Sequence, residues 1–266
     1  MPVTADRGVQ ILAVADEPPI ALTEPVREAP ALRLPKYGAI SFARRAFRAV
    51  GGFASTDVRR RLDSAQRFMV WNLWKMPRPQ LEDYLELAER IEDDAFVGSC
   101  VYADREAMLE AVPEGGTIAE MGVFQGGFSK LIAQHCKPTS LHLIDIDLAP
   151  LDEDGVRRAF DGELKMHEGD GPDVLSRFPE QSFDLIYVDA DHTYSAVARD
   201  LPAAHGALKP GGLMMCNDYA NWCSTSVAPY GVARAVNEFV NREAYSVVGL
   251  ALQPAGLYDI LLRKPI

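Results

Sequence analysis

The sequence predicts a doubly wound, mostly parallel α/β sheet of seven strands, because short apolar runs alternate with helical patterns from Thr117 onward. This alternation is typical of successive βαβ units. The last two apolar runs follow each other directly, which predicts an antiparallel hairpin at the edge of the sheet. The expected strands are 117–121, 140–144, 163–167, 185–188, 212–216, 244–253 and 258–263. The expected helices among them are 128–135, 155–160, 171–178, 194–208 and 232–241.

The chain divides by composition into three parts. Residues 1–35 are rich in Pro, Ala and Glu without sustained periodicity, which predicts a flexible arm. Residues 36–112 carry helical patterns and predict a helical extension. Its arginine-rich segment, 38–61, is interpreted as a solvated helical face packed on the body, or else as a patch for an acidic substrate or partner. Residues 113–266 hold the expected sheet.

Composition excludes several classes of protein. The chain has 266 residues, of which 48% are hydrophobic, enough for one substantial core with extensions. A net charge of -11 argues against a nucleic-acid partner. The four cysteines are widely spaced without a CxxC pair, which predicts reduced thiols rather than a zinc site. No apolar run is long enough for a signal segment or a membrane span, so a cytoplasmic protein is expected.

A glycine-rich turn joins the first expected strand to its helix. Gly122 at the strand end allows close approach of the backbone to a ligand, and Gly126 opens a helix whose first turn includes Ser129. The free N–H groups at such a helix start suit a carboxylate. Glu120 would then face an ammonium group of the same ligand, directly or through water. Taken alone, the turn is equally consistent with a tight turn that binds nothing.

Carboxylates also follow the next two expected strands. Asp145, with Asp147 as the alternative, lies where an acid binds ribose hydroxyls in nucleotide-binding sheets. Asp170 is placed to accept a hydrogen bond from an adenine amine, and Gly171 beside it allows close approach. Acids placed repeatedly at strand ends are rarely explained by packing. Together with the glycine turn they predict a nucleoside-containing cofactor.

A second group of polar residues lies at the ends of the fourth and fifth expected strands. Asp189, Asn217 and Asp218 should converge, because the carboxyl ends of neighbouring parallel strands line one crevice. Three oxygen-bearing side chains at one point suit a divalent cation such as magnesium. The alternative is a network in which these groups satisfy one another and the loop backbone.

These residues, in this order, resemble the class I S-adenosylmethionine-dependent methyltransferases. The Lys-Pro-Gly-Gly turn at 209–212 and the final hairpin, which nicotinamide-binding sheets lack, belong to the same resemblance, which runs from about residue 113 to the end. The segments 189–194 and 217–219 further resemble the macrocin-type sugar O-methyltransferases. This resemblance implies S-adenosylmethionine as methyl donor, magnesium at the predicted cation site, and a hydroxyl of a sugar or glycosylated small molecule as acceptor.

The resemblance also suggests a general base. Relatives use either of two positions on the loop after the fourth strand, which here are Asp191, ranked first, and His192. The family usually has two acids at the later pair, where this chain has an asparagine at 217, so one negative charge is missing from the cation site. The lysine of the catechol-type relatives is absent, since Thr193 and Tyr194 follow the motif, and this favours the sugar branch.

Three other functions compete with this interpretation. The asparagine at 217 keeps open a metal-independent methyltransferase acting on nitrogen or on an acidic hydroxyl. A cofactor-binding module without activity would use the arginine-rich segment to engage a partner. A nicotinamide oxidoreductase is disfavoured, because the turn lacks the G-x-G-x-x-G spacing. Relatives are often dimers or larger, and Trp71 and Trp74 are candidates for pairing chains, but the sequence leaves the oligomeric state open.

Overall fold

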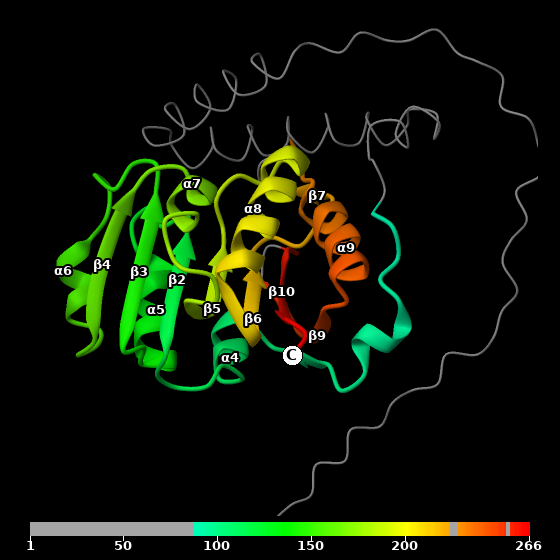
Figure 1. Cartoon of the computed structure of the whole chain (residues 1–266), viewed down its shortest axis with the longest axis horizontal. Coiled ribbons are helices and arrows are strands. Elements are labelled where there is room, and N and C mark those ends of the chain that lie inside the picture. Colours follow the sequence, from blue (N-terminus) through cyan, green and yellow to red (C-terminus); the bar gives the residue numbers. More distant parts are fainter. Residues whose placement is uncertain (1–87, 224–227, 254–255) are drawn as a thin grey trace, which may run out of the picture. The chain divides into compact units, whose positions relative to one another are not determined.

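The computed structural model describes residues 88–223, 228–253 and 256–266. The predicted arm, the arginine-rich segment and both N-terminal tryptophans lie outside these described residues. The described chain forms an α/β sandwich in which helices cover both faces of one large sheet (Figure 1). The predicted fold class is therefore confirmed.

The large sheet has eight strands in the order β1-β9-β10-β6-β5-β2-β3-β4. Only β10 runs antiparallel to its neighbours, and every other pairing in this sheet is parallel. The strands are β1 (Cys100–Tyr102), β2 (Thr117–Met121), β3 (Ser140–Asp145), β4 (Glu163–Glu168), β5 (Phe183–Val188), β6 (Leu208–Cys216), β9 (Ser246–Leu252) and β10 (Tyr258–Arg263). A separate two-stranded pairing joins β7 (Trp222–Cys223) to β8 (Ala228–Pro229).

The helices form a layer on each side of the sheet. One buried cluster joins one face of the sheet to α7, α8 and α9, and a second joins the opposite face to α4, α5 and α6. Alternate residues of each strand enter these two clusters, as the pleat of a sheet requires. The helices are η1 (Asp93–Phe96), α4 (Arg105–Leu109), α5 (Gly127–Cys136), α6 (Glu153–Arg157), α7 (Gly171–Leu175), α8 (Tyr194–Ala207) and α9 (Val232–Glu243).

In the large sheet the structure has one strand more than the seven predicted. Residues Cys100–Tyr102 form β1, which pairs in parallel with β9 at the sheet edge. Helix α4 begins at Arg105, with Asp104 accepting a hydrogen bond from the Ala107 amide as its N-cap, and it buries Met108 against the sheet. Residues before 113 thus pack on the same core, while the predicted domain boundaries stay predictions.

The predicted turn at 209–212 lies inside strand β6 rather than before it. Phe183 of β5 pairs with Leu208, whereas Leu185 pairs with Leu213, so β6 contains an irregular stretch between the two pairs. Gly211 in this stretch has φ +71°, a conformation that glycine adopts without strain. Downstream of it, β6 runs in register with β5 to Cys216 and delivers the next residues to the crevice.

No helix in the described part of the chain is long and apolar enough to cross a membrane.

Candidate active site

The candidate site lies where the order of the sheet reverses. The chain passes from β2 outward to β3 and β4, and then returns to β5 on the other side of β2. Open α/β sheets bind ligands at such a switch point, outside the carboxyl ends of the strands. The sequence-predicted site residues all follow or end strands at this edge, or begin the helices that come next.

Gly122 brings the two halves of the site into backbone contact. Its amide donates to the Ile144 carbonyl at 2.9 Å, and the Asp189 amide donates to the Met121 carbonyl at 2.8 Å. Gly122 has φ +88°, and a Cβ added there would overlap the backbone carbonyl of Asp189. The sequence assigned Gly122 to close approach of a ligand, but in the structure the neighbour that requires a glycine is the β5 loop.

Glu120 and Ser129 place two buried oxygen atoms beneath the glycine turn. Glu120 is 1% exposed and Ser129 is fully buried, and apart from each other the Glu120 Oε2 and Ser129 Oγ atoms have no hydrogen-bond partner. Burial raises the pKa of Glu120 to about 8, against a lowering influence from the neighbouring Ser129 hydroxyl. Buried polar atoms normally have partners, so these two indicate a place for a ligand with polar groups.

Asp145 holds the glycine turn in shape. Its Oδ2 atom accepts hydrogen bonds from the amides of Val123 at 2.7 Å and Phe124 at 3.0 Å, and its Oδ1 atom accepts from the amide of Asp147 at 3.1 Å. Phe124 has φ +49° and an exposed side chain. Each carboxylate oxygen can accept a further bond, so Asp145 remains able to bind a ribose hydroxyl. The alternative, Asp147, is exposed and caps the Ala149 amide.

The remaining cofactor residues begin helices. Gly126, at φ +74°, is the N-cap of α5 and packs under Leu151. Asp170 is the N-cap of α7, and its carboxylate forms an ion pair with Arg199 at 2.7 Å. At Gly171 a Cβ would meet the Met121 side chain. Thus both glycines are explained by packing, and Asp170 already has a partner within the chain.

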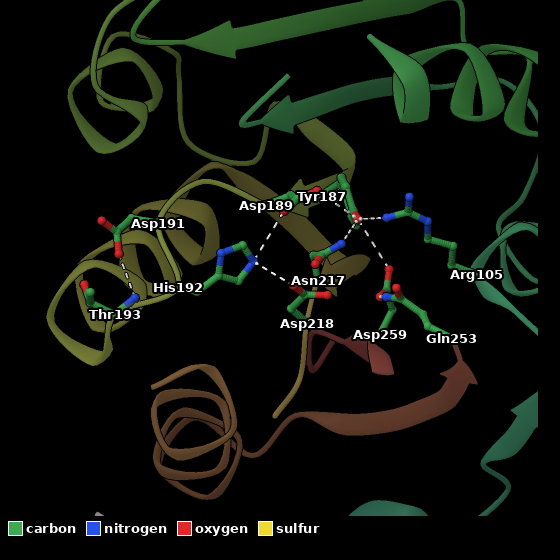
Figure 2. Close-up of polar contacts among 10 residues, drawn as sticks. All are labelled: Arg105, Tyr187, Asp189, Asp191, His192, Thr193, Asn217, Asp218, Gln253 and Asp259. Atoms are coloured by element: carbon green, nitrogen blue, oxygen red, sulfur yellow. Dashed lines mark hydrogen bonds and ion pairs between the residues drawn. The ribbon is translucent and has the colours of Figure 1, made fainter. Parts of the chain in front are cut away.

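The acids predicted at the second half of the site converge on His192. Its Nε2 atom lies 3.5 Å from Asp189 Oδ1 and 3.7 Å from Asp218 Oδ2 (Figure 2). Burial lowers the pKa of His192, but the carboxylates of Asp189 and Asp218 outweigh it and raise the pKa above its ordinary value. The imidazole ring also stacks on Tyr230, with centroids 4.7 Å apart. When His192 is protonated, its charge compensates those of two partly buried carboxylates.

Asp191 lies apart from this cluster. Figure 2 shows it on the other side of His192 from Asp189. Its Oδ1 atom accepts a hydrogen bond from the Thr193 amide at 2.6 Å, and the residue is exposed. The geometry therefore brings His192, rather than the first-ranked Asp191, to the two acids, and the choice of base stays a prediction.

Asn217 belongs to a buried network that the sequence did not predict. Its Nδ2 atom donates to the Tyr187 hydroxyl at 2.7 Å, and Arg105 Nη1 donates to the same oxygen at 3.3 Å. Asp189 and Asp259 each place an Oδ2 atom 3.3 Å from that hydroxyl (Figure 2). The available signal was a tyrosine and an acid in strands that are otherwise apolar, since such groups are buried only with partners.

The donor set at the second half of the site has the chemistry of a magnesium site. Asp189, Asn217 and Asp218 offer two carboxylates and one amide carbonyl. In the described residues, however, no three His, Cys, Asp or Glu side chains are arranged as ligands of one metal ion. Asp189, Asn217 and Asp218 can hold a cation only under two conditions. The Asn217 carbonyl must serve as a ligand, and the His192 ring must move out of its position between Asp189 and Asp218.

Residues 119–219 match the model of a family described as a methyltransferase domain. The chain is 22% identical over 205 residues to spermidine synthase 2 of Hyoscyamus niger, which covers 68% of this chain and 61% of that protein. It therefore spans about three fifths of the length of the curated relatives it matches.

Solved structures similar to it include the tRNA methyltransferase TrmK of B. subtilis, at 15% identity and a TM-score of 0.45, with 62% of this chain and 66% of that one covered. An O-methyltransferase of Bacillus cereus in complex with SAH is 13% identical at a TM-score of 0.45, with coverages of 60% and 78%.

Proposed function

We propose that this chain, whose residues 119–219 match a methyltransferase-domain family, is a class I S-adenosylmethionine-dependent methyltransferase that methylates a hydroxyl oxygen of a sugar or glycosylated small molecule. The donor half of the proposed site is the glycine turn with Glu120, Ser129 and Asp145. The acceptor half is the cluster of Asp189 and His192 with its neighbours. The choice of a sugar rests on the resemblance of 189–194 and 217–219 to the macrocin-type enzymes.

The observation that carries the proposal is the backbone contact between the two halves. Because Gly122 touches the Asp189 carbonyl, a donor bound over the glycine turn lies beside the acidic cluster. The methyl group of a sulfonium is already activated, so the enzyme mainly has to align it with a nucleophile. A cluster of acids and a histidine next to the donor supplies groups that can position a hydroxyl nucleophile and accept its proton.

Proton removal is assigned to His192. A sugar hydroxyl is a poor nucleophile while it keeps its proton, and a nearby base must take that proton during transfer. His192 would act as the base from its neutral form, and Asp189 and Asp218 would orient the ring and stabilise the imidazolium that forms when it takes the proton. Asp191, whose exposed carboxylate accepts from the Thr193 amide on the same loop, remains the alternative base.

Magnesium is included in the proposal, with Asp189, Asn217 and Asp218 as the residues that would hold it. A bound cation would lower the pKa of the acceptor hydroxyl and fix its position. In the structure His192 Nε2 lies against two of these residues, Asp189 and Asp218. That observation supports a second candidate, a metal-independent methyltransferase in which His192 alone balances the acids.

The test combines labelled S-adenosylmethionine with a panel of sugars, glycosides and amines, and identifies methylated products by mass spectrometry. We expect O-methyl products that disappear in excess chelator and return with Mg²⁺. Asp189→Ala should be inactive, whereas the matched control Asp161→Ala, at an exposed loop position, should keep full activity. Full activity in chelator would select the metal-independent candidate, and N-methyl products would reject the oxygen acceptor.

A further inference from the structure

The Tyr187 hydroxyl is the centre of a polar network whose inner members are fully buried and whose outer members, Arg105 and Asp189, are partly buried. Tyr187 and Asp259 are both fully buried, and Asn217 is 5% exposed. The Arg105 guanidinium lies 4.7 Å from the centre of the Phe128 ring, whose centroid is 4.3 Å from that of Tyr187. The positions of the arginine and of the phenol are thus fixed by packing as well as by hydrogen bonds.

The hydrogen-bonding capacity of the hydroxyl sets the direction of every bond in the network. A phenol has one proton to donate and two lone pairs to accept with. When Asp189 and Asp259 are both ionised, the proton goes to one of these two carboxylates, each 3.3 Å away, because an ionised carboxylate oxygen can only accept. Arg105 can only donate, and it takes one lone pair. The second lone pair is left for Asn217.

The Asn217 amide therefore has only one favourable orientation. Its NH₂ group must point to Tyr187, where the N–O distance is 2.7 Å, because a carbonyl in that place would have to compete with two carboxylates for one proton. The carbonyl oxygen then faces away from Tyr187. Figure 2 shows this oxygen on the side of Asn217 that faces His192 and Asp218.

An aspartate at 217 would meet an unfavourable environment in this network. Its carboxylate would be buried beside Asp189 and Asp259, and like charges at short range in a buried site are destabilising. It would also leave the second lone pair of the Tyr187 hydroxyl without a donor. The asparagine supplies an oxygen to the site and a donor to the hydroxyl at once.

We propose that Tyr187, held by Arg105 and Asp259, is a positioning residue that turns the carbonyl oxygen of Asn217 toward the Asp189–Asp218 pair. This inference rests on the proposed function, because the oriented oxygen serves either a cation or the acceptor at that pair. Relatives usually have acids at both 217 and 218, and this chain has an asparagine at 217. An oriented Asn217 carbonyl would supply the oxygen ligand that the missing acid provides in those relatives.

The orientation itself is tested in the metal-free protein by NMR of the Asn217 side-chain NH₂, assigned through its loss in Asn217→Asp. In the wild type these protons should exchange slowly with water. In Tyr187→Phe their signals should shift and exchange should accelerate at least tenfold. Tyr258→Phe, at a partly exposed tyrosine of β10, is the matched control and should leave the signals unchanged. Unchanged signals and exchange in Tyr187→Phe would overturn the inference.

The consequence is tested by a double-mutant cycle with Mn²⁺ as the metal probe, read by electron paramagnetic resonance without acceptor. Removing a residue that orients a metal ligand typically costs 10–100-fold in affinity, and that loss is expected for Tyr187→Phe. In an Asn217→Asp background the same substitution should cost less than threefold, because a carboxylate has two equivalent oxygens and needs no orientation. S-adenosylmethionine affinity should change less than twofold throughout.

An equal loss in both backgrounds would mean that Tyr187→Phe merely damages the fold, and the inference would be wrong. If the wild type binds no Mn²⁺ while its Asn217 NH₂ is protected and released by Tyr187→Phe, the metal part of the proposed function fails and the positioning role holds. The two failures are therefore distinguishable.

Discussion

Glu120→Gln tests the donor half of the site through the stability of the cofactor-free protein. An unfolded glutamate ionises near its ordinary pKa of 4.5, whereas burial raises the pKa of folded Glu120 to about 8. Between these values the unfolded chain has lost the proton that the folded chain keeps. The free energy of unfolding therefore falls as pH rises, by about 1.4 kcal/mol for each pH unit.

The expected size of the effect follows from that slope. From pH 6 to pH 8 the slope alone gives a loss on the order of 3 kcal/mol, which is reduced to roughly 2 kcal/mol because the folded carboxyl is itself half ionised at pH 8. Glu120 is 1% exposed, so solvent screening does not diminish the effect. Glutamine cannot ionise, and Glu120→Gln should lose about 2 kcal/mol less stability over the same range.

The measurement is urea denaturation of the wild type and of Glu120→Gln at pH 6 and pH 8, without cofactor. Other titrating groups are common to both proteins, so the difference between the two pH responses isolates Glu120. Glu110→Gln, at the exposed end of α4, is the matched control and should respond like the wild type. Identical pH responses for Glu120→Gln and the wild type would refute the argument that the carboxyl is buried and protonated.

Two further substitutions test the site at its backbone and at its base. Gly122→Ala should destabilise the protein by about 1–3 kcal/mol and abolish S-adenosylmethionine binding, because its φ is positive and a Cβ overlaps the Asp189 carbonyl. Thermal shift measures the stability of each variant, and calorimetry measures its binding of S-adenosylmethionine. Gly127→Ala, where a Cβ has open space, should change neither. Equal effects of the two substitutions would contradict the argument that Gly122 is required by its close contact with Asp189. His192→Ala should lower kcat about 10²–10⁴-fold with little change in cofactor affinity, while Asp191→Asn should stay within about threefold of the wild type. The reverse ranking of these two kcat values would assign the base to Asp191.

The sheet was largely predictable because its parallel strands are buried on both faces and appear in the sequence as short apolar runs. Strand β1 could not be recognised in this way. It has three residues, and the side chains of Cys100 and Val101 are exposed at the sheet edge. It is a strand because it pairs with β9, about 150 residues later in the chain, and that contact cannot be predicted from the local sequence.

The candidate site was predictable to the extent that topology alone positions it. Asp145, Asp189 and Asp218 follow parallel strands, so their convergence at one edge follows from the fold class. The partners of the Tyr187 hydroxyl were not predictable. Asp259 reaches it from the antiparallel strand β10, 72 positions away, and side-chain packing across that register decides the contact.

The charges of the described site also suit a cationic ligand. Four carboxyl groups, Glu120, Asp189, Asp218 and Asp259, surround two cations, Arg105 and His192. Burial raises the pKa of Asp259 to about 7 and that of Glu120 to about 8, so near neutral pH these two acids are wholly or partly protonated and the net charge of these six side chains is small. A positively charged group arriving at the Glu120 carboxyl lowers its pKa and releases a proton. If the proposed donor, which carries an ammonium and a sulfonium, binds at the glycine turn, its binding would be coupled to ionisation of Glu120, and the site would stabilise the charge of the donor only after that acid has ionised.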